Sequence, residues 1–164
     1  MTKTKINAVL LLSILLSATA CSLENPTTPK AEASSPTVDN ALPSMVGYKN
    51  ANCGCCQDWV DYVEKSGYAV ETIELEDVDP IKTSHGLTDP ALKSCHTAII
   101  DGYVIEGHVP VSDIERLLAE RPDITGLTAP GMPAMSPGMG SETPENYDVL
   151  AFDETGRSSV FSSY

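Results

Sequence analysis

The sequence predicts an α/β domain in which a central mixed sheet is flanked by helices, and three observations lead to this expectation. Apolar residues recur at helical spacing in two segments, 56–63 and 111–118. Strand-like segments at 44–49 and 68–75 precede and follow the first of these helices. An Asp-Gly pair joins the segments TAII and YVIE, which is a strong signature of a tight β-hairpin.

The residues before this domain resemble an export signal. A short basic segment is followed by the apolar run 6–16, the small residues SATA and then Cys21. The run is too short for a comfortable membrane-spanning helix. We therefore expect a lipoprotein-type signal peptide at 1–20, with lipidation of Cys21, and simple secretion is the alternative.

A tether is expected between the lipid and the domain. Residues 21–43 are rich in Ser, Thr, Pro and Ala and have no apolar periodicity, which is typical of a disordered linker. The folded domain is then expected at 44–164, in the periplasm and anchored to a membrane through its lipid alone.

The chain is strongly acidic. It carries 23 acidic and 10 basic residues, and loss of the signal peptide, which holds two lysines and no acids, changes the net charge from −13 to −15. This charge argues against nucleic acid or an anionic surface as a partner.

The first expected helix begins at the sequence CGCC. Its apolar stripe is formed by Cys56, Trp59, Val60 and Val63, and Gly67 is placed to end it. Trp59 is expected in the core.

A strand at 68–75 and a short helix follow. Asp79 is expected to cap this helix, with Pro80 at its first position and Gly86 at its end.

The hairpin turn at Asp101-Gly102 fixes a register. If Ile100 faces Tyr103, residues whose numbers sum to 203 face each other, which places Thr97 opposite Glu106. The same register places Cys95 opposite His108, close enough to share a ligand.

The remaining elements complete a known order. A helix is expected from Pro110 to Arg121, and the segments YDVLAF and SVFSS, which flank DETG, predict a closing hairpin. Strand, cysteine-bearing helix start, strand, helix, hairpin and helix is the order of a thioredoxin-like fold. In that fold Cys95 would enter from the position usually taken by the cis-proline loop, so the cysteines and two imidazoles would converge at one end of the sheet.

Besides Cys21, four cysteines remain, and outside the cytoplasm thiols tend to be oxidised or metal-bound. Cys53 and Cys56 form a C-x-x-C pair with Cys55 inside it. A helix N-terminus stabilises thiolate, which serves both disulfide exchange and binding of soft metals. A third neighbouring thiol invites scrambling in an oxidoreductase, whereas bridging sulfurs suit Cu(I).

Two further groups of soft or borderline ligands favour copper. Cys95-His96 and His108 add sulfur and nitrogen donors. The Pro/Gly-rich loop APGMPAMSPGMG offers thioethers at neither helical nor strand spacing, from Met132, Met135 and Met139. Zinc is less favoured because the paired C-x2-C spacing is absent.

Four stretches, CGCCQDWVDYVEKSGYAV, LKSCHTAIIDGYVIEGHVP, IERLLAERPDITGL and APGMPAMSPGM, resemble the CopG-type copper-resistance proteins, a periplasmic bacterial family. The resemblance covers roughly residues 49–164. It implies a thioredoxin-like fold and copper bound through the CxCC motif, with redox handling of Cu(I)/Cu(II). Tyr62 and Met135 depart from the residues usual in the family.

Carried over to this sequence, the resemblance implies a ligand set. Its members are the four cysteines Cys53, Cys55, Cys56 and Cys95, with His96, His108, Met132, Met135 and Met139 as further candidates. His108 and Met132 are expected as terminal ligands of a thiolate-bridged Cu(I) cluster, with copper ions and other periplasmic copper-handling proteins as partners.

Two alternatives stay open at this point. One is a thiol–disulfide oxidoreductase that uses Cys53 and Cys56. The other is a small binding module stapled by two disulfides, which would leave no free thiol and no metal.

Overall fold

The computed structural model describes residues 42–164. The expected signal peptide, Cys21 and the tether up to residue 41 lie outside the described residues. No helix within the described part of the chain is both long enough and apolar enough to cross a membrane.

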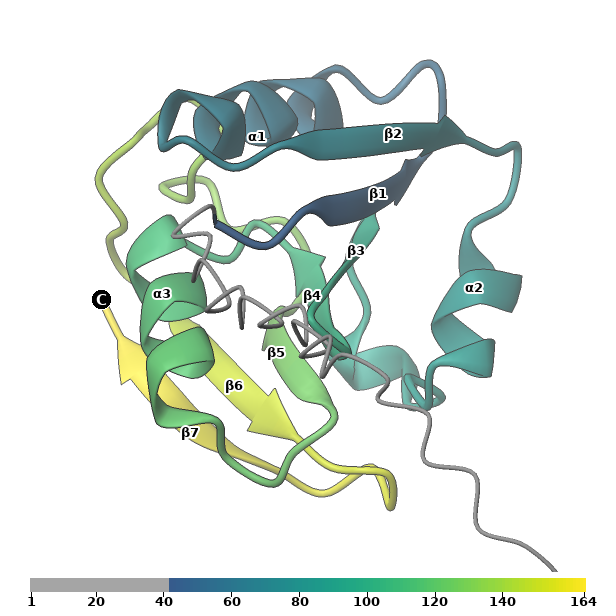
Figure 1. Cartoon of the computed structure of the whole chain (residues 1–164), viewed down its shortest axis with the longest axis vertical. Coiled ribbons are helices and arrows are strands. Elements are labelled where there is room, and N and C mark those ends of the chain that lie inside the picture. The colour runs from purple at the N-terminus through teal and green to yellow at the C-terminus, as the bar shows by residue number, and fades with distance from the viewer. Residues whose placement is uncertain (1–41) are drawn as a thin grey trace, which may run out of the picture. The chain divides into compact units, whose positions relative to one another are not determined.

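The described chain is an α/β domain with a mixed sheet and three α-helices (Figure 1). In chain order the elements are β1 (Met45–Lys49), α1 (Gly54–Lys65), β2 (Val70–Glu74), α2 (Asp79–Ser84), the 3-10 turn η1 (Pro90–Leu92), β3 (Thr97–Ile100), β4 (Tyr103–Gly107), α3 (Val111–Glu120), β5 (Gly126–Ala129), β6 (Asp148–Phe152) and β7 (Ser158–Ser163).

All seven strands form one sheet in the order β2-β1-β3-β4-β5-β6-β7. The pairs β1–β2 and β4–β5 are parallel, and the other neighbours are antiparallel. In Figure 1 the β6–β7 hairpin, in yellow, lies at the opposite edge of the sheet from β2. The cysteine-bearing segments belong to the half formed by β1, β3 and β4.

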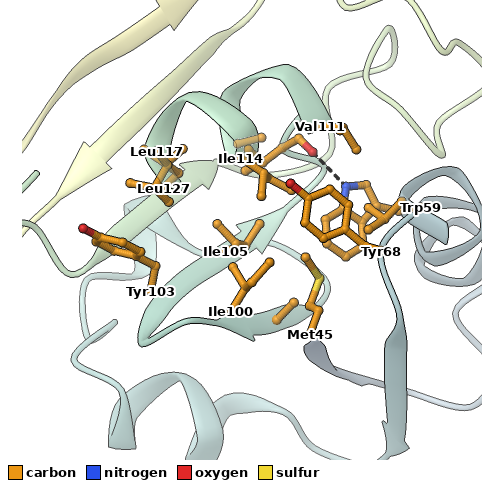
Figure 2. Close-up of a cluster of buried hydrophobic side chains, with 14 of the residues drawn as sticks. Met45, Trp59, Tyr68, Ile100, Tyr103, Ile105, Val111, Ile114, Leu117 and Leu127 are labelled. Carbon is orange, nitrogen blue, oxygen red and sulfur yellow. Dashed lines mark hydrogen bonds between the residues drawn. The ribbon is translucent and has the colours of Figure 1, made fainter. Parts of the chain in front are cut away.

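The main core lies between the sheet and two helices, α1 and α3. Figure 2 shows Trp59 of α1 pointing toward Val111 and Ile114 of α3, above Ile100 and Ile105 of the sheet. These side chains are almost completely buried. The indole N–H of Trp59 also donates a hydrogen bond of 2.9 Å to the carbonyl of Val109, which ties α1 to the segment that enters α3.

A second apolar cluster covers the other face of the sheet. It consists of Leu87, Leu92, Val104 and Phe152. Leu87 and Leu92 belong to the segment that follows α2. Because neighbouring residues of a strand point to opposite faces, β4 sends Ile105 to the first core and Val104 to the second.

The hairpin register is confirmed. Ile100 pairs with Tyr103 and Thr97 with Glu106, as the sum of 203 predicts. Asp101 and Gly102 both have positive φ, of 49° and 86°, as a type I′ turn requires.

The expected helices and their stop signals are also confirmed, with one correction. The buried residues of α1 are the four of its predicted stripe, and Gly67, Gly86 and Arg121 follow their helices with positive φ. Asp79, however, lies inside α2, and Val78 is the N-cap. The Asp77 carboxylate takes the capping role instead, since it accepts a 2.9 Å hydrogen bond from the Asp79 N–H.

One strand was not expected. β5 is buried along its whole length, so it lacks the polar–apolar alternation that marks a strand with one solvated face. It pairs in parallel with β4, with Gly107 opposite Ala129.

Candidate metal centre

The four cysteines converge at one end of the sheet, although Cys95 is far from the others in sequence. Cys53 is the N-cap of α1, and Cys55 and Cys56 lie in its first turn. Cys95 lies two residues before β3. Their four sulfur atoms all lie within 4.8 Å of one another. The convergence predicted from the element order and the hairpin register is therefore observed.

Two of these sulfurs are joined. Cys53 and Cys56 form a disulfide with a Cα–Cα separation of 5.3 Å, while Cys55 and Cys95 are free thiols. The alternative of two disulfides is therefore wrong for the described residues. A site that uses all four sulfurs as thiolates needs this disulfide to be reduced.

The start of α1 favours negative charge on sulfur. No side chain caps this helix end, and its first turn contains no acidic residue. The free N–H groups and the helix dipole therefore act on Cys55 and Cys56 without competition from a carboxylate.

His108 is oriented toward Cys95 by a carbonyl group. The carbonyl of Pro137 can only accept a hydrogen bond, and it lies 2.7 Å from Nδ1 of His108, so Nδ1 carries the proton. Burial lowers the pKa of His108, which keeps the ring neutral. The lone pair on Nε2 therefore faces the Cys95 sulfur, 3.3 Å away. A carbonyl that fixes the tautomer of a histidine is a common arrangement behind a metal ligand.

His96 contacts the same thiol. Its Nδ1 is 3.4 Å from the sulfur of Cys95, and its ring packs 4.6 Å from that of Trp59 and 5.0 Å from that of His108. Its Nε2 is buried and has no hydrogen-bond partner. Burial first, then His108 and Lys82, lower the pKa of His96 well below its ordinary value.

Cys95 is protonated in this environment. Burial, followed by repulsion from Cys55, raises the pKa of the Cys95 thiol to about 11. A bound cation would replace this proton, because a metal ligates thiolate rather than thiol.

The methionine loop borders the cysteine pocket at two points. At its start, Gly131 donates a 2.9 Å hydrogen bond to the Lys93 carbonyl and accepts one from the Ser94 hydroxyl. Near its end, Gly138 approaches α1 so closely that a Cβ there would lie 2.8 Å from the carbonyl oxygen of Cys55. The loop is thus held against both cysteine-bearing segments.

The three methionines differ in exposure. Met132, which follows Gly131, and Met135 are exposed, while Met139, which follows Gly138, is half-buried. Met132 and Met139 are therefore next in sequence to the two points of contact. Met135 lies between them, where its carbonyl accepts a hydrogen bond from Glu145.

A buried ionic network beside the pocket was not predicted. Lys82 of α2 donates to Glu106 at 2.6 Å and to Thr97 at 3.0 Å, and Thr97 donates to the second oxygen of Glu106. Glu106 also accepts a 2.6 Å hydrogen bond from the backbone N–H of Ser94, the residue before Cys95. The network therefore helps to hold the Cys95 segment. A glutamate in the otherwise apolar strand YVIEG was the signal that could have revealed it.

The donor set matches a soft cation. Thiolate sulfur and neutral imidazole nitrogen are ligands for Cu(I) and for zinc, whereas magnesium and calcium require oxygen ligands. No carboxylate belongs to either group of candidate ligands found among the described residues, which are the four cysteines and the Cys95, His96 and His108 set.

Comparison with known proteins agrees with this chemistry. A family model described as "Protein of unknown function, DUF411" matches residues 92–139, the segment that holds Cys95, both buried histidines and the methionine loop. No curated protein matches the chain. Two solved structures, described as forms 1 and 2 of the copper resistance protein CopG, match at 38% identity. Each match covers 75% of this chain and 98% of the solved chain, with a TM-score of 0.68. The chain, with its cysteine cluster able to hold a metal, therefore belongs to the family of the copper resistance protein CopG.

Proposed function

We propose that this protein holds Cu(I) in a cysteine-bridged, multinuclear site and thereby contributes to copper resistance. The observation that carries the proposal is the convergence of four cysteine sulfurs within 4.8 Å of one another. Membership of the CopG family supports copper as the metal. Copper is the cargo of the site. Cys53, Cys55 and Cys95 are half-buried, so ions can reach the site from solution.

Softness is the physical reason for Cu(I). Thiolates and thioethers select Cu(I) over harder cations, and a thiolate can bridge two ions. Several sulfurs in one pocket therefore favour several closely spaced ions. In this arrangement Cys53, Cys55, Cys56 and Cys95 supply bridging thiolates once the disulfide is reduced.

Terminal ligands are available beside the sulfurs. The lone pair of His108 Nε2 is directed at Cys95, which supports His108 as a nitrogen ligand. Met132 is exposed next to Gly131, at the start of the loop that borders the pocket. His96, Met135 and Met139 are the further candidates.

We also propose that the fold is thioredoxin-like and that the protein is located in the periplasm. The strand order β2-β1-β3-β4, with a βαβ unit followed by a hairpin and α3, supports the first. The basic, apolar and small-residue segments before Cys21 support export and a lipid anchor.

A second function is favoured by one observation, the Cys53–Cys56 disulfide at the start of α1. A thiol–disulfide oxidoreductase uses such a pair, which takes two electrons and two protons from a substrate dithiol. Against this role, the free Cys55 sulfur lies 3.6 Å from that of Cys53, so it competes as an internal nucleophile. We therefore favour copper binding.

Copper content and sulfur ligation test the proposal. Reduced full chain, loaded anaerobically with Cu(I) and desalted, should retain more than one copper per chain with sulfur-dominated X-ray absorption. Cys56→Ser should lower that content sharply. Met132→Leu should weaken retention modestly, whereas the matched control Met45→Leu, at a core thioether at the far end of β1, should not.

An oxidoreductase would give the opposite pattern. Its disulfide exchange with a dithiol substrate would persist in Cys55→Ser and in Met132→Leu, and the reduced chain would retain no copper after desalting. That outcome would overturn the copper proposal.

A further inference from the structure

The disulfide divides the candidate ligands into two halves. Cys53 and Cys56 are joined to each other, while Cys55 and Cys95 keep free thiols in the same pocket. Cys95 also belongs to a second group with His96 and His108, whose ligand atoms lie within 4.8 Å of one another. The oxidised protein therefore retains two sulfur donors and two nitrogen donors.

We propose that the oxidised protein binds a single Cu(I) ion at Cys55, Cys95 and His108, and that reduction of the Cys53–Cys56 disulfide converts this small site into the larger cluster. This inference rests on the proposed function and adds to it a dependence of copper capacity on the redox state. The two states differ in how many ions the same pocket accepts.

The geometry fits one ion. Metal–sulfur bonds of about 2.3 Å allow two sulfurs on one ion to be at most about 4.6 Å apart. The sulfurs of Cys55 and Cys95 lie within 4.8 Å, close to that limit without rearrangement of the backbone. The Nε2 lone pair of His108 is directed at the Cys95 sulfur, 3.3 Å away, so His108 can bind the ion from the Cys95 side.

Cys95 is the residue that the two states share. It is the only one of the free thiols with imidazole nitrogens at 3.3 and 3.4 Å among the described residues. Ser94, its neighbour, is fixed through its N–H by Glu106 and through its hydroxyl by Gly131. Cys95 therefore keeps its position while the bond between Cys53 and Cys56 opens.

The conversion is a balanced two-electron reaction. An external dithiol reductant attacks the Cys53–Cys56 bond, gives up two electrons and two protons, and becomes a disulfide itself. The S–S bond of the protein breaks, and Cys53 and Cys56 become thiols. Binding of further Cu(I) then releases their protons to solvent.

Copper stoichiometry in the two redox states is the test. The full chain is prepared anaerobically in oxidised form or after dithiol reduction and removal of the reductant, and is loaded with Cu(I) as its acetonitrile complex. Thiols are then alkylated under denaturing conditions and counted by mass spectrometry, which verifies that the disulfide survived loading. We expect about one copper per oxidised chain and at least about two per reduced chain.

Two variants identify the site. Cys55→Ser keeps the disulfide but should sharply weaken copper binding by the oxidised form, which then retains only one thiolate. The double variant Cys53→Ser with Cys56→Ser lacks the disulfide and should bind about one copper whether or not it has been reduced. Circular dichroism of each variant establishes that it is folded.

The outcomes separate the two proposals. Copper on the reduced chain but none on the oxidised chain would overturn the inference and leave the proposed function intact, as would unchanged binding by oxidised Cys55→Ser. No copper in either state would overturn both.

Discussion

Two buried polar regions lie at the same end of the β3–β4 ladder, on opposite faces of the sheet. On the α2 face, Lys82, Glu106 and Thr97 form a network in which the ammonium and both carboxylate oxygens have partners. On the α1 face, the Cys95 sulfur contacts ring nitrogens of both His96 and His108, and the second ring nitrogen of His96 has no hydrogen-bond partner.

The difference between these regions indicates their roles. Each region is expensive to bury, because polar groups lose their contact with water. In the ionic network, hydrogen bonds within the protein offset this cost, and the charged groups have partners inside the fold. In the cysteine pocket, His96 Nε2 has no partner and His108 Nε2 faces only a weakly hydrogen-bonding thiol. Donors left over in a buried pocket favour a ligand from outside.

The largest expected effect comes from breaking the ionic network. Glu106→Gln removes the charge that neutralises Lys82, whose side chain is only 3% exposed. An unpaired buried ammonium should lower the free energy of unfolding by about 3–5 kcal/mol. Urea denaturation measures this loss. A loss of under about 1 kcal/mol would show that the fold does not depend on this network.

A change in the pocket should affect copper more than stability. His108→Asn keeps an amide N–H that can reach the Pro137 carbonyl, but it removes the Nε2 lone pair. Cu(I) affinity, measured by competition with a chromophoric chelator, should fall about 10- to 100-fold. Without metal, His108→Asn should lower the free energy of unfolding by less than Glu106→Gln does. Unchanged affinity would remove His108 from the ligand set.

The pH dependence of stability should report the buried imidazoles. Burial lowers the pKa of both His96 and His108 in the folded chain, so below the ordinary value of about 6.5 the unfolded chain binds more protons. The stability that these neutral rings confer is complete above about pH 6.5 and is lost as the pH falls, by up to about 1.4 kcal/mol per pH unit for each ring.

Urea denaturation of the metal-free protein between pH 7 and pH 5 measures that slope. His108→Asn removes one of the two rings, so its slope should be shallower than that of the parent. Equal slopes would show that carboxylates alone account for the acid sensitivity.

The smallest effect is expected at an ion pair outside both regions. Lys65 and Glu142 are 3.0 Å apart, but their side chains are 69% and 68% exposed. Solvent screens such a pair, so Lys65→Met should leave the denaturation midpoint unchanged within error. A loss comparable to that of Glu106→Gln would show that burial is not what distinguishes the network.

Much of the pocket could be predicted from one turn. Asp101-Gly102 determines the hairpin register, and the register places Cys95 beside His108 and Thr97 opposite Glu106. The apolar stripe on α1 determines which face Cys56 and Trp59 occupy. These inferences needed only local sequence and the geometry of strand pairing.

The rest depends on contacts between distant segments. Lys82 lies on a short helix whose position over the sheet no local pattern gives, so its ion pair with Glu106 was missed. The C-x-x-C spacing did indicate Cys53 and Cys56 as a redox pair, but the sequence alone could not decide between this disulfide, other pairings and free thiols. The strand at 126–129 was not predicted because both of its faces are buried, so its residues do not alternate between polar and apolar faces.

The register set by the turn at Asp101-Gly102 constrains the evolution of both regions together. A slip of the β3–β4 pairing by one residue would exchange the faces of β4, which would turn Glu106 into the apolar layer under α1 and Ile105 toward Lys82. A lineage could replace the turn residues, or lengthen the loop with a bulge, but it could not slip the register without losing the ion pair and the imidazole together. Natural variants should therefore keep a threonine-like partner opposite the buried acid of β4, even where the letters of the turn have diverged.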